Sequence, residues 1–157
     1  MRWIVALLAL LGLLASVAAL REHYRTEASP CSINEKWDCG IVNHSPYAVV
    51  GGVWRHVRQK LSGSIVEFKP FTGVERLPVA VVGIAGYLAL GILAMKRAWR
   101  IAFFASVIGL GFSLYLTYIE AHDLQIWCIY CVISLTMISL ITLSNLIIAL
   151  KAVKAPA

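Results

Sequence analysis

The chain has 157 residues, of which 60% are hydrophobic and 14% are charged. A soluble domain usually carries about 25% charged and about 45–50% apolar residues, so this composition excludes an ordinary soluble domain and a disordered chain. The formal net charge is +6, but the basic residues flank apolar runs, as they do in membrane proteins. The sequence therefore predicts a single membrane domain over residues 1–157, and its positive charge does not predict nucleic-acid binding.

Four apolar stretches reach the length that crosses a bilayer, which is about 20 residues. None of them contains Lys, Arg, Asp or Glu. In lipid, every backbone polar group must find its partner within the protein, so such stretches form helices. The prediction is an all-α membrane protein, a bundle of four transmembrane helices that cover about residues 3–20, 78–95, 101–119 and 127–150.

The first apolar stretch has an alternative interpretation. Arg2, the apolar run and the small residues 15–18 together resemble a secretory signal peptide with a cleavage site. The run is longer than the apolar region of such a peptide, which spans about 7–15 residues. This length favours a helix that is retained in the mature protein.

The charges around the helices indicate how the bundle is oriented. Six basic residues lie at the chain ends and in the connection between the second and third helices: Arg2, Lys96, Arg97, Arg100, Lys151 and Lys154. The remaining segments, residues 21–77 and 120–126, carry all eight acidic residues. Because positive charge is retained in the cytoplasm, we expect both termini there. The outer loop of residues 21–77 then faces the periplasm of a bacterial inner membrane, or the lumen of the endoplasmic reticulum in a eukaryote.

All four cysteines fall on this outer side or at its edge. An oxidising compartment permits disulfides there, and four cysteines allow three pairings. A structural disulfide in the outer loop remains an alternative to redox chemistry. A four-cysteine zinc site is less favoured, because seven residues separate Cys31 from Cys39, whereas structural zinc sites favour closer spacings.

The second pair, Cys128 and Cys131, has the spacing Cys-x-x-Cys at the predicted start of the last helix. Free backbone N–H groups and the positive end of the helix dipole favour a thiolate there, so we expect a lowered pKa for Cys128. Cys131 lies one turn deeper on the same face, where an apolar redox carrier could reach it. Cys31 and Cys39 lie in a polar loop that could carry a disulfide from an outside partner to Cys128.

With these motifs the chain resembles the vitamin K epoxide reductase family. The match consists of the loop cysteine pair, Ser45 in Ser-Pro-Tyr-Ala, the run of residues 77–83, and the segment Trp-Cys-Ile-Tyr-Cys of residues 127–131. The resemblance implies a four-helix bundle around a quinone. It also implies that Cys128 and Cys131 form the active-site pair, and that Cys31 and Cys39 form a shuttle pair reduced by a thioredoxin-like protein. By position, Cys31 would meet that partner, Cys39 would attack Cys128, and Cys131 would face the quinone.

Two departures from the family pattern bear on the substrate. Vertebrate members have a tyrosine at the position of Leu135, and their pocket asparagine has no counterpart in residues 77–80. Both departures favour simple quinone reduction over reduction of vitamin K epoxide. The expected activity is a thiol–disulfide oxidoreductase that reduces a quinone (ubiquinone, menaquinone or a vitamin K-like quinone) and supports disulfide formation, with its thioredoxin-like partner acting in trans. The alternatives are a vitamin K epoxide or quinone reductase, and a non-enzymatic membrane protein stapled by disulfides.

Further residues are candidates for the quinone site. Apolar residues recur at helical spacing from Val50 to Leu61 and predict an amphipathic helix in the membrane interface. Its Trp54 is either a lid over the quinone or an interfacial anchor. Aromatic residues near the outer helix ends either stack on the quinone or form the interfacial belt. The predicted quinone-binding residues are Ser45, Trp54, Phe112, Tyr115, Tyr130 and Leu135.

The short turn before Cys128 contains Glu120, His122 and Asp123. Quinone reduction consumes two protons, so a titrating group in this turn could assist it. The favoured interpretation is a solvated turn.

Overall fold

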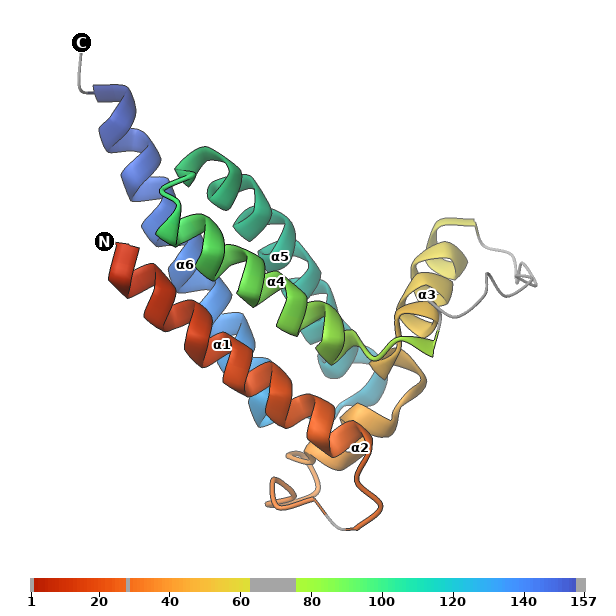
Figure 1. Ribbon diagram of the computed structural model, residues 1–157. Helices are drawn as coiled ribbons and strands as arrows, with labels where there is room; N and C mark the ends of the chain where they lie inside the picture. Colours follow the sequence, from red (N-terminus) through yellow and green to blue (C-terminus); the bar gives the residue numbers. More distant parts are fainter. Residues whose placement is uncertain (1, 28, 63–75, 155–157) are drawn as a thin grey trace.

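A computed structural model of the chain describes residues 2–27, 29–62 and 76–154, and within these residues every regular element is helical. The long helices lie side by side in a bundle (Figure 1). They are α1 (Arg2–His23), α4 (Val79–Met95), α5 (Trp99–Ile119) and α6 (Ile129–Lys154). The short elements α2 (Cys39–His44) and η1 (Pro46–Ala48) lie at one end of the bundle, and α3 (Val50–Ser62) projects from it. The start of α1 and the end of α6 lie at the opposite end of the bundle (Figure 1).

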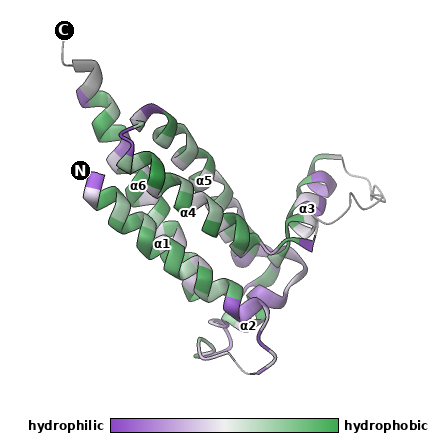
Figure 2. Cartoon of the chain, viewed as in Figure 1, coloured by the Kyte–Doolittle hydropathy of each residue, from purple (hydrophilic) through white to green (hydrophobic). Residues whose placement is uncertain are grey.

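The bundle has the composition of a membrane protein. Hydrophobic residues cover the long helices, whereas hydrophilic residues gather around α2, α3 and the connection between α4 and α5 (Figure 2). Segments Arg2–His23, Trp99–Leu124 and Ile129–Lys151 are long and apolar enough to cross a bilayer. Helix α4 is equally apolar but has 17 residues, which corresponds to about 26 Å, slightly less than a hydrocarbon core of about 30 Å. The predicted count of four spans therefore stays a prediction.

The last helix begins later than predicted. Helix α6 starts at Ile129, so Trp127 and Cys128 precede it. The Trp127 N–H donates to the Lys36 carbonyl at 2.8 Å, and the Trp127 carbonyl accepts from the Asp38 N–H at 3.1 Å. These bonds to the outer loop keep Trp127 out of the helix, because they use its backbone groups in a short extended pairing.

Helix α1 is part of the bundle core. Val5 and Ala9 of α1 pack with Tyr87 and Leu90 of α4 and with Ile141 of α6 in one buried cluster. A Cβ added at Gly12 would overlap the ring of Tyr87. Only glycine therefore allows α1 and α4 to approach this closely.

Helix α3 has the predicted amphipathic character, and its polar side chains attach it to the outer end of the bundle. His56 is buried, and its Nδ1 lies 2.7 Å from the Tyr115 hydroxyl of α5. Its Nε2 lies 3.3 Å from the carboxylate of Asp123. The Lys60 ammonium donates to the Tyr118 hydroxyl at 3.1 Å. The predicted outer loop continues through residues 63–75, which lie outside the described residues.

Candidate functional site

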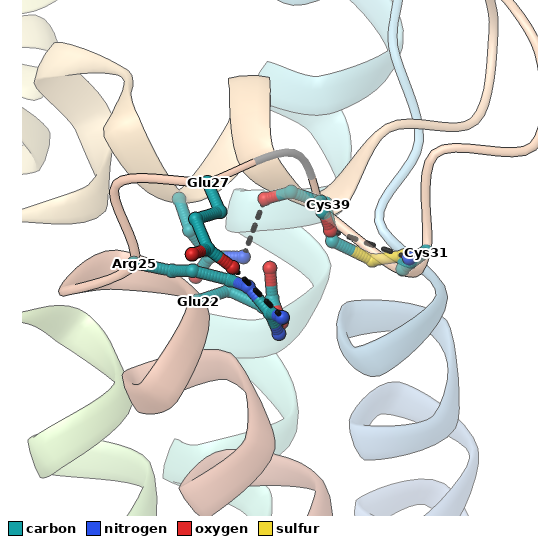
Figure 3. Close-up of polar contacts among 7 residues, drawn as sticks. Glu22, Arg25, Glu27, Cys31 and Cys39 are labelled. Carbon is teal, nitrogen blue, oxygen red and sulfur yellow. Dashed lines mark hydrogen bonds and ion pairs between the residues drawn. A yellow bond between two sulfur atoms is a disulfide. The ribbon is translucent and has the colours of Figure 1, made fainter.

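The cysteines of the two pairs meet at the outer end of the bundle. Cys31 and Cys39 form a disulfide (Figure 3), whereas Cys128 and Cys131 are free thiols. Cys31, Cys39 and Cys128 form one buried cluster with Val42, and Cys131 packs against it. Two of the four sulfurs are joined to each other, an arrangement that a four-cysteine zinc site would not have. The outer disulfide and the inner dithiol are therefore neighbours in one apolar pocket.

Backbone pairing holds the outer loop against the start of α6. The two hydrogen bonds of Trp127 to Lys36 and Asp38 place Cys39, the next residue after Asp38, beside Cys128. The indole rings of Trp37 and Trp127 lie 6.3 Å apart, at the point where the backbones of the loop and of Trp127 pair. The loop was predicted as a carrier that reaches out to a partner, and in this structure it is docked on the inner pair.

Asp38 fixes the orientation of Cys39. It is the N-cap of α2, and its Oδ1 accepts a hydrogen bond from the Ile41 N–H at 3.0 Å. Its Oδ2 accepts from the Ser32 hydroxyl at 2.7 Å. The Ser32 bond, followed by the Ile41 N–H, lowers the pKa of Asp38. The cap therefore fixes the start of α2 at Cys39, which shares a buried cluster with Cys128.

An ion-pair cluster ties down the chain just before this loop. Arg25 lies 3.5 Å from the carboxylate of Glu22, which is buried at the end of α1, and 4.0 Å from the exposed Glu27 (Figure 3). Exposed ion pairs contribute little to stability, so the contact to the buried Glu22 is the relevant one. It connects the end of α1 to the segment that leads to Cys31.

Cys128 has the environment of a stabilised thiolate. A hydrogen bond from the Cys131 thiol lowers the pKa of Cys128 below its usual value, and the N–H groups of Cys131 and Tyr130 act in the same direction against the effect of burial. The Asn43 amide also donates to the Cys128 sulfur at 3.6 Å. The predicted lowering of this pKa is confirmed. Cys128 is completely buried, in the cluster that it forms with Val42 and the two disulfide cysteines.

Cys131 opens into a cavity of about 250 Å³ between the long helices. Apolar groups line most of this cavity, with a few hydroxyls and one carboxylate among them. Three of the predicted quinone-binding residues line it: Ser45, Phe112 and Tyr130. The Cys-x-x-Cys pair thus has Cys128 in the buried cluster of the outer disulfide and Cys131 at the wall of a mostly apolar cavity.

The other three predicted quinone-binding residues lie outside the lining of this cavity. Trp54 is on the exposed face of α3, because the opposite face of α3 carries His56 and docks on the bundle. Tyr115 turns its hydroxyl toward that histidine. Leu135 packs against the helix core on another face of α6.

The sequence arguments missed Tyr87 and Asn43 at the site, and for Glu120 they favoured a solvated turn over a role in proton transfer. Tyr87 lines the cavity, and its hydroxyl donates to the Ser134 carbonyl at 2.7 Å. Asn43 contacts Cys128, and Glu120 is buried beside the free thiols. The solvated-turn interpretation of Glu120 was wrong, because residues 120–124 continue α5 as a π-helix and leave only part of the turn exposed. Asn43 follows Cys39 by one helical turn, and that spacing is a signal that could have found it.

Comparison with known proteins supports this arrangement. The model of the Vitamin K epoxide reductase family matches residues 3–146, which is nearly the whole chain. The chain belongs to the vitamin K epoxide reductase family. A comparison with curated individual proteins finds no match. The predicted family is thereby confirmed, and with it a membrane oxidoreductase of a quinone-associated family.

The cavity suits the quinone with which the vitamin K epoxide reductase family is associated. A quinone ring is flat and apolar, and its two carbonyl oxygens accept hydrogen bonds. The lining offers an apolar wall that includes Leu90, Phe112 and Ile138. Its polar residues include Ser45 and Tyr87, whose hydroxyls donate to the Val42 and Ser134 carbonyls at 2.7 Å. An apolar pocket with few polar groups is the usual form of a site for such a molecule.

Proposed function

We propose that this protein passes electrons from a thioredoxin-like thiol protein through its two cysteine pairs to a membrane quinone, and so supports disulfide formation outside the cytoplasm. The observation that carries the proposal is the placement of the oxidised pair and the reduced pair in one cluster. The Cys31–Cys39 disulfide and Cys128 share a buried cluster, while Cys131 lines the apolar cavity. This is the product expected after the outer pair, once reduced by a partner, has reduced the inner pair.

Exchange between the pairs follows from the chemistry of Cys128. A reduced Cys39 attacks the Cys128 sulfur of an inner disulfide and gives a mixed disulfide, with Cys131 as the leaving thiol. Cys31 then attacks Cys39, the outer disulfide forms, and Cys128 leaves as a thiolate. A thiol of lower pKa leaves faster, so the contacts that lower the pKa of Cys128 favour this second step.

The inner pair delivers two electrons to the cavity. A quinone bound there would accept two electrons and two protons. Cys131 is placed to give up its thiol proton at the cavity wall, and Cys128 is placed to close the disulfide with it one helical turn away. Cys128 is completely buried beneath the docked loop, and Cys131 is partly buried at the cavity wall.

The proposal includes a topology. Helices α1, α4, α5 and α6 would each cross the membrane, with both termini and the linker around Lys96 in the cytoplasm. The cysteine pairs would then face the periplasm, or the lumen of the endoplasmic reticulum. The start of α1 and the end of α6 lie at the bundle end opposite α2, which supports this arrangement (Figure 1).

The test is quinone reduction by the purified protein in detergent, with a reduced thioredoxin-like protein as donor. We expect donor-dependent turnover with ubiquinone or menaquinone, and its complete loss in Cys131→Ala. Vitamin K epoxide serves as a third acceptor, because the departures at Leu135 predict little turnover with it. No turnover with any acceptor would overturn the proposal and favour a protein stapled by its disulfide.

A further inference from the structure

Glu120 is a buried carboxylate beside the free thiols. It lies in the π-helical turn η3 (Glu120–Leu124) at the outer end of α5, and it is 3% exposed. Its side chain lines the same cavity as Cys131. A buried carboxylate is unfavourable unless hydrogen bonds compensate for its lost hydration, so its partners indicate why it lies there.

Those partners are the two thiol-bearing residues. The Glu120 Oε2 accepts a hydrogen bond from the Cys128 N–H at 3.3 Å. The Cys131 thiol has two acceptors that share its one proton, the Cys128 sulfur and the Glu120 carboxylate. Glu120 therefore bridges the backbone of one cysteine and the sulfur of the other, and it does so at the wall of the cavity.

The other charged groups of the turn face away from the thiols. His122 is exposed, and its ring stacks on Tyr118 of α5. Asp123 pairs with His56 of α3. Within the part of the chain that the structure describes, the titratable side chains recorded as interacting with Glu120 are Cys128 and Cys131.

We propose that Glu120 accepts the proton of the Cys131 thiol when the inner pair is oxidised, and releases it into the cavity. The inference rests on the proposed function and adds a catalytic residue to it. No other carboxylate in the described residues lines the cavity.

The proton and electron balance is as follows. The S–H bond of Cys131 breaks, its proton moves to a Glu120 oxygen, and the S–S bond between Cys128 and Cys131 forms. The two electrons released by the dithiol reduce the quinone, which also takes up two protons. One of them comes from Glu120, and the other comes from water on the outer side, where exchange had released the proton of Cys128. Glu120 ends the cycle as the carboxylate with which it began.

The experiment compares Glu120→Gln and Glu120→Asp with wild type, and uses Glu27→Gln as a matched control. Glutamine keeps an oxygen for the Cys128 N–H but takes up no proton. Glu27 is an exposed carboxylate on the same side of the bundle, with 84% of its side chain exposed. Three quantities are measured: steady-state quinone reduction, single-turnover oxidation of the donor without quinone, and the infrared S–H stretching band of Cys131 in the reduced, quinone-free protein.

We expect Glu120→Gln to lower quinone reduction about 100-fold, which is typical of losing a positioned proton acceptor. Donor oxidation in a single turnover should stay within about threefold of wild type, because it needs only thiol exchange. The S–H band of Cys131 should move toward the position of a free thiol, since one of its two charged acceptors is gone and only the Cys128 sulfur remains. Glu120→Asp should reduce quinone at least about tenfold faster than Glu120→Gln. Glu27→Gln should match wild type in all three measurements.

If Glu120→Gln reduces quinone as fast as wild type, this inference is overturned and the proposed function stays intact. An equal loss of donor oxidation and quinone reduction would also overturn it, because it would assign Glu120 a purely structural role. Absence of turnover in the wild type would instead overturn the proposed function.

Discussion

Two buried asparagines at opposite ends of the bundle have nearly the same set of contacts. At the outer end, the Asn43 amide donates to the Cys39 carbonyl at 2.8 Å and to the Cys128 sulfur at 3.6 Å. At the inner end, the Asn145 amide donates to the Ala102 carbonyl at 3.3 Å and to the Ser106 hydroxyl at 3.4 Å. Each amide therefore donates to one backbone carbonyl and one side chain.

The difference lies in the second acceptor. At the outer end it is the sulfur of a free thiol, and the bond stabilises that thiol as a thiolate. At the inner end the second acceptor is the Ser106 hydroxyl on the neighbouring helix α5. Thr142 also donates to Ser106, at its carbonyl, over 3.2 Å. Together the two bonds hold α5 against α6. Polar groups act in this way between membrane helices, where each such bond contributes modestly. Burial of an amide is therefore not by itself a sign of function in this fold.

Alanine at each of the two positions should separate these roles. Asn43→Ala should slow single-turnover thiol exchange about tenfold, since a hydrogen bond to a charged group contributes about 1.5–3 kcal/mol. Asn145→Ala should leave the exchange rate unchanged and lower the stability of the bundle by about 1 kcal/mol. The measurements are stopped-flow donor oxidation and the midpoint of thermal unfolding in detergent. Equal effects of the two variants on exchange would remove the distinction between the two ends.

The sequence predicted the inner end of the molecule better than the outer end. The helices follow from uninterrupted apolar runs, because lipid imposes one simple requirement on them. That inference needed only local sequence and the nature of the solvent. At the outer end, the two cysteine pairs were implied by the family resemblance, and the lowered pKa of Cys128 was expected from a helix start, whereas its largest cause is the Cys131 thiol.

The outer end depends on contacts between distant segments. The loop docks because Trp127 pairs with residues that precede it by about 90 positions, and nothing in its local sequence indicates this pairing. Glu120 was expected to be solvated because it lies beside a histidine and an aspartate, and only the π-helical turn brings it to the thiols. Trp54 was offered either as a lid over the quinone or as an interfacial anchor, and in the structure it is exposed, whereas Val53 and His56 of α3 are buried.

Two glycines offer a test of the cavity wall at the outer end. A Cβ at Gly52 of α3 would collide with the Pro46 carbonyl oxygen of η1, and Ser45, Tyr47 and Ala48 in that region line the cavity. Overpacking of this kind costs about 1–3 kcal/mol. Gly52→Ala should therefore displace the cavity wall and raise the KM for quinone about fivefold or more, as measured by steady-state kinetics.

Gly111 of α5 provides the matched control, because a Cβ there would have no neighbour within 4 Å. Gly111→Ala should leave the KM unchanged and slightly stabilise the helix, by up to about 1 kcal/mol. An unchanged KM in Gly52→Ala would mean that the wall formed by residues 45–48 does not contact the quinone.

The smallest expected effect concerns the pH dependence of stability at the two ends. Asp38 caps α2 at the outer end, and loss of such a cap costs about 1 kcal/mol. Because the pKa of Asp38 is lowered in the folded protein, through Ser32 and the Ile41 N–H, its ionised form stabilises the fold. This contribution is fully present above the unfolded value of 3.8 and is lost as the pH falls through the lower folded value.

The difference in thermal stability between wild type and Asp38→Ala should therefore be constant at neutral pH and should narrow below pH 4, once the carboxylate of wild type is protonated. The difference for Asn145→Ala should stay constant over the same range, because the inner cluster of Ser106, Thr142 and Asn145 contains no titratable group. Glu35→Ala changes an exposed carboxylate of the same outer loop that caps no helix. Its thermal stability should equal that of wild type at every pH. If the stability differences of Asp38→Ala and Asn145→Ala from wild type change with pH in the same way, the pH-sensitive polar contacts do not lie at the outer end alone. Separate profiles would show that the fold holds its outer loop by charge and its inner helices by neutral hydrogen bonds.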